Sequence, residues 1–162
     1  MNLPKADDLA RPRPRIRRAT AADTSLLTSL MLASSAYQGD YARILKNYRI
    51  TPEQVSRDLI YLAESSGAVL GFYSLTLGAE PELDLMFVSD AAQGTGMGRQ
   101  LFEHMRDEAR QRGIPAVMVI SHPPSVGFYR RMGAELIGVK PPSPPRVTWE
   151  RPILTLRTGV AW

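Results

Sequence analysis

The sequence predicts a single α/β domain in which helices flank a mixed, central β-sheet. Three observations predict this class. The chain has 162 residues, enough for one ordinary domain but not for two well-packed ones. Strand patterns alternate with segments of helical periodicity along most of its length. A glycine-rich loop at residues 93–98 joins a strand pattern directly to an amphipathic helix pattern.

The first elements are a short strand and a helix. Residues 15–18 are expected to form the first strand. A helix then begins after an N-cap at Thr20 or Asp23 and runs to about Ala33. Its apolar face repeats at helical spacing and consists of Leu26, Leu27, Leu30 and Met31.

Two further helices are predicted before the first long strand. One covers about residues 41–47. The next begins at Thr51, whose hydroxyl is a suitable N-cap, followed by Pro52 at the first helical position and by Gln54 as the partner in a capping box. We expect this helix to continue to about Glu64.

Two strands separated by a turn precede the glycine-rich loop. Residues 68–77 alternate small and large apolar side chains and predict a strand. Residues 82–88 predict the next one. Their alternation places Glu82, Asp84 and Met86 on one face and Leu83, Leu85 and Phe87 on the other.

The second half of the chain opens with a strongly amphipathic helix over residues 99–112, ended by Gly113. Its His104 stands among charged residues and is expected on the solvated face. The remaining predicted elements are a buried strand, a short helix and two final strands, at residues 116–120, 126–132, 134–139 and 151–158.

Composition excludes several chemistries. The chain has no cysteine and only two histidines, so a disulfide framework, a thiolate zinc site, a cysteine nucleophile and a three-histidine metal site are excluded, and we expect no metal. The longest apolar-rich stretch, about residues 68–79, is interrupted by glycine and serine and is too short to span a bilayer. The start lacks the apolar segment of a secretory signal, so we expect a cytoplasmic protein with no membrane partner.

The positive charge of the chain is concentrated at its start. The net charge is +4, yet residues 19–162 hold 14 basic and 14 acidic side chains. Residues 1–14 are rich in arginine and proline and are expected to form a disordered leader before a domain at residues 15–162. Such an arm can bind nucleic acid. No aromatic residue interleaves its arginines and the domain behind it is neutral, so we expect no nucleic-acid partner.

The glycine-rich loop indicates phosphate binding, and its spacing separates three possibilities. It lacks the Gly-Lys-Ser/Thr of a P-loop. A dinucleotide fingerprint is excluded because Arg99 or Leu101 would occupy the last glycine position. The pattern that fits is Gln-x-x-Gly-x-Gly, formed by Gln93, Gly96 and Gly98 between a strand and an amphipathic helix.

This loop resembles that of the GNAT superfamily of acyl-CoA-dependent N-acetyltransferases. Residues 128–134, Phe-Tyr-Arg-Arg-Met-Gly-Ala, are similar to the family's Phe-Tyr-x-x-x-Gly-Phe segment, and residues 16–23 are similar to a common first strand. The order of elements agrees from about Arg15 to about Thr158. The resemblance implies an α/β (α+β) fold with a mixed, mostly antiparallel central sheet that contains a splayed strand pair.

The resemblance also implies acetyl-CoA as cosubstrate. Glycines allow backbone N–H groups to approach phosphate oxygens, and the following helix adds the partial positive charge of its N-terminus. Arg99 adds a full charge. The expected cofactor-binding residues are Met86, Phe87, Val88, Gln93, Gly94, Thr95, Gly96, Met97, Gly98, Arg99 and Ser125.

Acetyl transfer to an amine requires an acid and a base. Tyr129 matches the family tyrosine that protonates the departing thiolate. Glu82 is the preferred base and Asp84 its rival, and two acids so close could instead attract a cationic amine. The alternative for each residue is structural: a packing aromatic for Tyr129 and a solvated acid near a strand start for Glu82.

The acceptor is expected to be a small-molecule or peptide amine. Candidate acceptor residues are Tyr37, Tyr41 and His122, the last standing where many family members have asparagine. The sequence therefore predicts an N-acetyltransferase that acts by direct, sequential attack, since the commonest covalent acyl carrier, cysteine, is absent. A non-catalytic acyl-CoA-binding or regulatory module is the alternative. A homodimer is one assembly that the sequence allows.

Overall fold

A computed structural model describes residues 13–161. All of the predicted leader except residues 13 and 14 therefore lies outside the described residues. Within them, strands form two antiparallel sheets. The first has the order β1 (Arg15–Arg18), β2 (Leu59–Ser65), β3 (Ala68–Leu75) and β4 (Leu83–Val88), and the second has the order β5 (Ala116–Ile120), β7 (Arg151–Arg157) and β6 (Glu135–Lys140).

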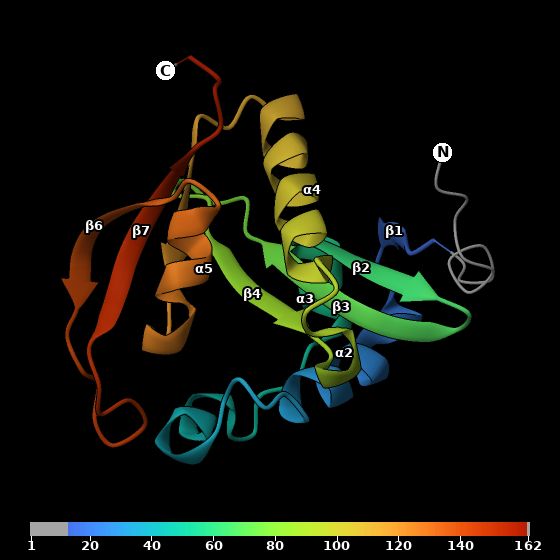
Figure 1. Ribbon diagram of the computed structural model, residues 1–162, viewed down its shortest axis with the longest axis horizontal. Helices are drawn as coiled ribbons and strands as arrows, with labels where there is room; N and C mark the ends of the chain where they lie inside the picture. Colours follow the sequence, from blue (N-terminus) through green and yellow to red (C-terminus); the bar gives the residue numbers. More distant parts are fainter. Residues whose placement is uncertain (1–12, 162) are drawn as a thin grey trace, which may run out of the picture.

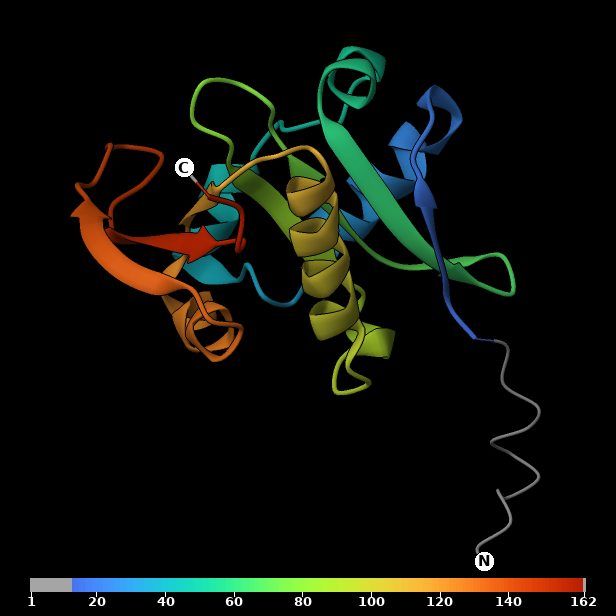
Figure 2. The same cartoon turned by 90° about the horizontal axis from the view of Figure 1, so that it is seen from above.

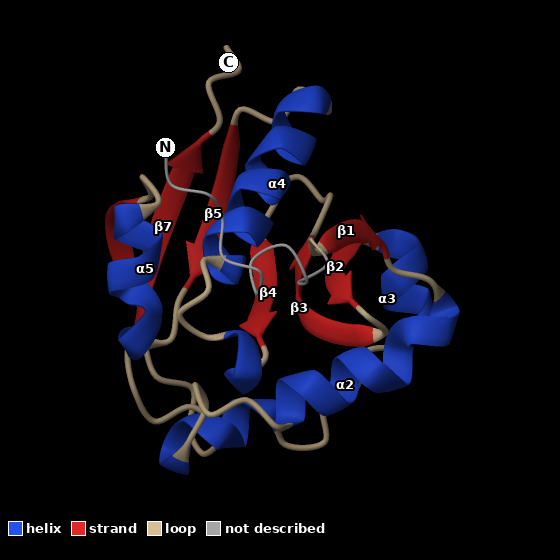
Figure 3. Ribbon diagram, turned by 45° about the vertical axis from the view of Figure 1, so that its right-hand side comes forward, coloured by secondary structure: helices blue, strands red, loops and turns tan. Residues whose placement is uncertain are grey.

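The two sheets meet at β4 and β5 and then separate. Glu82 and Met118 form an isolated parallel bridge, and the Met118 N–H donates to the Pro81 carbonyl at 2.9 Å. Beyond this point the described residues show no further ladder between the two strands, which diverge in Figure 3. The predicted mixed sheet with a splayed strand pair is confirmed.

Helices cover both faces of the first sheet. The α4 helix (Met97–Gln111) packs Leu101, Phe102 and Met105 against one face, in a cluster that includes Tyr73. The α2 helix (Thr24–Leu32) and the α3 helix (Pro52–Arg57) pack against the opposite face, where Phe72 lies. Figure 3 shows α4 and α2 on opposite sides of β3 and β4. The short helices are η1 (Ala21–Asp23), η2 (Gly39–Leu45), η3 (Asp90–Ala92), η4 (Pro123–Ser125) and α5 (Val126–Arg131).

The prediction of one helix from Thr51 to Glu64 is wrong in its second half. The capping box is present, with the Gln54 N–H donating to Thr51 Oγ1 at 3.2 Å, but α3 ends at Arg57 and β2 follows. β2 is a central strand whose successive residues alternate between the clusters under α4 and α2. Burial on both faces removes the apolar–polar alternation that identifies a strand, so the run resembles a helix in sequence.

The predicted alternation along β4 also fails, because the strand contains a bulge. Ser74 pairs with Leu85 and Leu75 pairs with Leu83, so Asp84 is an extra residue in β4. Leu83 consequently packs in the cluster under α4, whereas Leu85 and Phe87 pack in the cluster under α2. A bulge shifts the side chains on one side of it to the other face. The alternation of residues 82–88 is therefore broken at the candidate bases.

Two smaller expectations differ from the structure. The helix expected at residues 41–47 is a 3₁₀ helix, Gly39–Leu45. His104 is partly buried rather than on a solvated face, and its Nδ1 lies 2.7 Å from the Tyr73 hydroxyl. Within residues 13–161, no helix is long and apolar enough to cross a membrane.

Candidate active site

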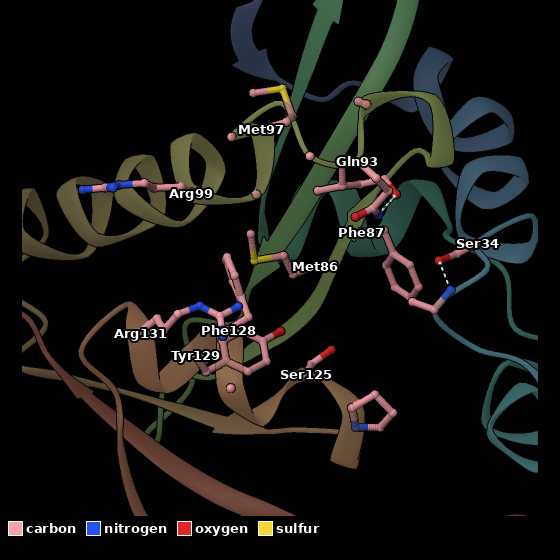
Figure 4. A pocket seen from close by; sticks show the side chains of 18 residues that line it. Ser34, Met86, Phe87, Gln93, Met97, Arg99, Ser125, Phe128, Tyr129 and Arg131 are labelled. Carbon is pink, nitrogen blue, oxygen red and sulfur yellow. Dashed lines mark hydrogen bonds between the residues drawn. The ribbon is translucent and has the colours of Figure 1, made fainter.

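A cavity of about 490 Å³ opens where β4 has separated from β5. Its walls come from the end of β4, the glycine-rich loop, the start of α4, the α5 region and the segment after α2 (Figure 4). Eleven of the predicted site residues line it: Met86, Phe87, Val88, Gln93, Gly94, Gly96, Met97, Gly98, Arg99, Ser125 and Tyr129.

The glycine-rich loop has a backbone conformation that depends on glycine. Gly94 and Gly96 have φ angles of 75° and 83°, in the left-handed region, and Gly96 is the N-cap of α4. Among the described residues, the N–H groups of Gly94, Gly96 and Gly98 donate to no protein acceptor. The loop and the first turn of α4 thus present free donors together with the positive end of the helix dipole.

The loop also lies close to the helix on the other side of the cavity. A Cβ at Gly98 would lie 3.5 Å from the Phe128 ring and 3.6 Å from Val88 Cγ2. The Gln93 amide donates to the Val88 carbonyl at 3.1 Å and ties the loop to the end of β4. The concave cradle of unpaired N–H groups has the donors and the space that a pyrophosphate-bearing cofactor requires.

Two loop side chains do less than expected. Arg99 forms an exposed ion pair with Glu103, 3.0 Å apart, and Figure 4 shows its side chain directed away from Gln93 along α4. The Thr95 hydroxyl donates to the Ala92 carbonyl at 2.5 Å, and Thr95 does not line the cavity. Arg131, which was not among the predicted site residues, supplies a second cation to the lining.

Tyr129 lies on α5 at the junction of the cavity with the core. Tyr129 is only 9% exposed, and its ring packs against Phe128 and Phe102. Among the described residues no hydrogen bond is made to its hydroxyl, although the residue lines the cavity. Burial raises the pKa of Tyr129 above its ordinary value, with a smaller contribution from Tyr37. The phenol therefore keeps its proton at neutral pH.

The two candidate bases lie two positions apart in the chain but have different surroundings, and neither lines the cavity. Partial burial raises the pKa of Glu82, while Lys140 and Arg151 act to lower it. Part of Asp84 is exposed to solvent. The protein atoms around its carboxyl group nevertheless desolvate it, and this desolvation raises its pKa to about 6. Asp58 and Glu82 add to this rise.

Ser74 is the polar side chain that accompanies Asp84. It is fully buried, and its hydroxyl makes no hydrogen bond within standard geometry. Its weaker polar contact with Asp84 acts to lower the pKa of that carboxyl group. Asp84 is thus held near the middle of its titration at mildly acidic pH by opposing effects.

The three predicted acceptor residues gather in one aromatic cluster beside the cavity. Tyr37 stacks on His122 with ring centroids 4.2 Å apart, and Tyr41 contacts His122 edge-on and also contacts Trp149. Tyr37 also contacts Phe87, which lines the cavity, and burial raises the pKa of Tyr37 to about 12. The cluster borders the cavity through Phe87, but its three predicted members do not themselves line it.

His122 is buried, and its tautomer is fixed. The residue is 6% exposed, and Nε2 lies 3.1 Å from the Ala36 carbonyl oxygen. Because a carbonyl oxygen only accepts, Nε2 carries the proton and Nδ1 is an acceptor. Burial lowers the pKa of His122, so the ring is neutral at pH 7.

Part of the lining was not predicted from the sequence: Ser34, Ala36, Ala92, Pro124, Gly127, Phe128 and Arg131. Ser34 and Ala36 follow α2 and reach the cavity only because the chain folds back. No local sequence pattern indicates that these two residues lie there. A sequence signal does exist for three of them. The Phe-Tyr motif had located the short helix that carries Tyr129, and Gly127, Phe128 and Arg131 lie on that helix.

Comparison with known proteins agrees with this geometry. A family model described as "Acetyltransferase (GNAT) domain" matches residues 36–140. The chain is 30% identical over 105 residues to an IAA acetyltransferase of Azospirillum brasilense, covering 60% of this chain and 69% of that relative.

Solved structures share the fold at low sequence identity. The ribosomal-protein-S18-alanine N-acetyltransferase of Escherichia coli superposes with a TM-score of 0.71 at 18% identity, over 93% of this chain and 97% of that one. A PaiA N-acetyltransferase of Thermoplasma acidophilum, in complex with coenzyme A, also superposes with a TM-score of 0.71. Its identity to this chain is 15%, over 90% of this chain and 99% of that one. The family match, the fold and the loop agree, and the chain belongs to the GNAT family of acetyltransferases.

Proposed function

We propose that the protein transfers an acetyl group from acetyl-CoA to a primary amine by direct attack. The observation that carries this proposal is the single cavity in which the glycine-rich loop and Tyr129 face the same space. The name of the Azospirillum relative and the coenzyme A bound in the Thermoplasma structure support it.

The residues that would hold the donor are those of the loop and of β4. The free N–H groups of Gly94, Gly96 and Gly98 suit the pyrophosphate, and Arg131 adds charge. Met86, Phe87 and Val88 line the cavity at the point where the described β4 has no partner on its outer edge. Their backbone groups are available to an extended ligand.

When bound, acetyl-CoA supplies an acetyl thioester, whose sulfur needs a proton on departure. Tyr129 holds that proton at its hydroxyl, because burial keeps the phenol neutral. Glu82 or Asp84 accepts the proton that an ammonium must lose to become a nucleophile, directly or through water. The aromatic cluster of Tyr37, Tyr41 and His122 would position the acceptor. Direct attack is favoured because the given chain has no cysteine to carry the acyl group.

The experiment is a thiol-release assay with acetyl-CoA over a panel of amines: polyamines, amino acids, aminoglycosides, peptides and protein lysines. Mass spectrometry of the product should show one added acetyl group on an amine. Binding of acetyl-CoA is measured in parallel by calorimetry. Binding without turnover on any amine would favour a non-catalytic acyl-CoA-binding module, and the absence of both would overturn the proposal.

A further inference from the structure

β6 forms the outer edge of the second sheet. It pairs on one side with β7, and within residues 13–161 no strand pairs with its other side. Figures 1 and 2 both show β6 at the edge of the molecule. An open edge presents a row of unpaired N–H and C=O groups that can pair with another chain.

The side chains of β6 are unusually apolar for an open edge. Leu136, Ile137 and Val139 are 48%, 61% and 51% exposed, and they are consecutive apart from Gly138. Edge strands of soluble proteins generally carry charges or proline that prevent such pairing. In β6 the charges stand only at the two ends, Glu135 and Lys140.

A bulge sets the faces of β6. Leu136 pairs with Leu154 and Gly138 pairs with Ile153, so Ile137 is an extra residue. Glu135 and Lys140 pair with Thr155 and Arg151, which lie on one face of β7, whereas Leu136 and Val139 pair with Leu154 and Pro152 on the other. Without the bulge, residues five apart would lie on opposite faces.

The charges at the two ends of β6 have no ion-pair partner in the described part of the chain. Lys140 lies directly opposite Arg151, a like-charge pair that is unfavourable across strands. Glu82 interacts electrostatically with both cations at the Lys140 end, at a longer range than an ion pair. The edge is therefore negative at one end and positive at the other.

We propose that β6 pairs antiparallel with β6 of a second copy, about a two-fold axis between Ile137 and Gly138. This register places Glu135 opposite the partner's Lys140 and Leu136 opposite the partner's Val139. Because the bulge puts Glu135 and Lys140 on one face, both charge pairs form at once, as an isologous interface requires. The two three-stranded sheets then form one continuous sheet. The dimer does not depend on the proposed function.

We expect the strand that pairs with β6 to come from a second copy, because the charges and the bulge of β6 restrict which strand can pair with it. Antiparallel pairing here needs a segment with a cation at its end, an acid at its start and apolar residues between, interrupted by the same bulge. β6 is itself such a segment. A straight foreign strand would meet the bulge and lose its register.

The experiment measures mass by analytical ultracentrifugation across the micromolar range for the full chain and its variants. The wild type is expected to show a concentration-dependent dimer. Glu135→Lys and Lys140→Glu each create two like-charge pairs and should raise the dissociation constant about tenfold. The double variant Glu135→Lys/Lys140→Glu restores opposite charges in every pair and should recover wild-type association.

Ile137→Glu should also weaken the dimer, whereas Leu26→Arg, which changes an exposed leucine on α2, is the matched control and should not. All these positions are exposed, and circular dichroism checks that each variant folds. A wild type that stays monomeric, or a dimer insensitive to β6 changes, would overturn the proposal. If both single changes weaken the dimer and the double change fails to restore it, the antiparallel register is wrong.

Discussion

The two halves of the candidate site are built in different ways. The half proposed to bind the donor, residues 86–99, is nearly continuous in sequence and offers mainly backbone groups to a ligand. The half proposed to serve the acceptor consists of side chains from separate segments: Tyr37, Tyr41, Glu82, Asp84 and His122. Backbone conformation is set by neighbouring residues, so a local motif can encode it. A wall of side chains exists only after the whole chain has folded.

Tyr129 stands between the two halves, and its replacement should have the largest effect. Tyr129→Phe removes the hydroxyl proposed as the proton donor but keeps the ring that packs on Phe128. We expect kcat to fall about 10²- to 10⁴-fold while the acetyl-CoA dissociation constant stays nearly unchanged. Tyr61→Phe is the matched control, since that tyrosine lies outside the cavity lining. A Tyr129→Phe enzyme with normal kcat would show that the hydroxyl has no chemical role.

Asp84→Asn and Glu82→Gln separate the two acids of the acceptor half. If Asp84 is the base, wild-type kcat/KM should rise with pH through about 6, where its carboxyl group ionises. Asp84→Asn should then lower the rate about 10²-fold and remove this limb, whereas Glu82→Gln should retain it. If the limb survives in Asp84→Asn and is lost in Glu82→Gln, Glu82 is the base.

The stability of Asp84→Asn gives an independent check on the same carboxyl group. Its pKa is raised from 3.8 to about 6 on folding, so the unfolded chain loses the proton first as pH rises. Wild-type stability should therefore fall between pH 3.8 and about 6 relative to Asp84→Asn, and the gap should stay constant above. Urea unfolding of both proteins at several pH values measures this difference in the free energy of unfolding. A gap that does not change with pH would contradict the raised pKa.

The sequence alone could predict the donor half because each of its parts has a local cause. The glycines of positive φ and the amphipathic α4 both follow from residues close in sequence. β2 could not be recognised, because burial on both faces erased its alternation. The bulge at Asp84 could not either, because it is defined by pairing with β3. The contact of His122 with Tyr37 joins residues 85 positions apart.

Gly96→Ala tests whether the donor half depends on backbone conformation. Gly96 has a φ of 83°, which a Cβ strains, although no atom lies within 4 Å of that Cβ. We expect about 1 kcal/mol of lost stability and about tenfold weaker acetyl-CoA binding, with KM for the amine unchanged. Gly78→Ala is the control, because Gly78 is equally open but has no positive φ. Equal effects of the two changes on acetyl-CoA binding would contradict the conformational argument.

The smallest effect is expected from a change outside both halves. It tests whether the glycine-rich loop depends on a contact between α4 and the sheet. The Tyr73 hydroxyl, on β3, bonds to His104 of α4, the helix that begins at the glycine-rich loop. Tyr73→Phe removes one partly buried hydrogen bond and should cost about 1 kcal/mol of stability. Tyr61→Phe, whose ring also packs on His104 without a hydrogen bond among the described residues, should cost less. Because the loop is held by its own glycines and by Gln93, Tyr73→Phe should leave acetyl-CoA affinity and kcat unchanged. If affinity falls with stability, the tie between α4 and β3 positions the loop, and the donor half is not encoded locally.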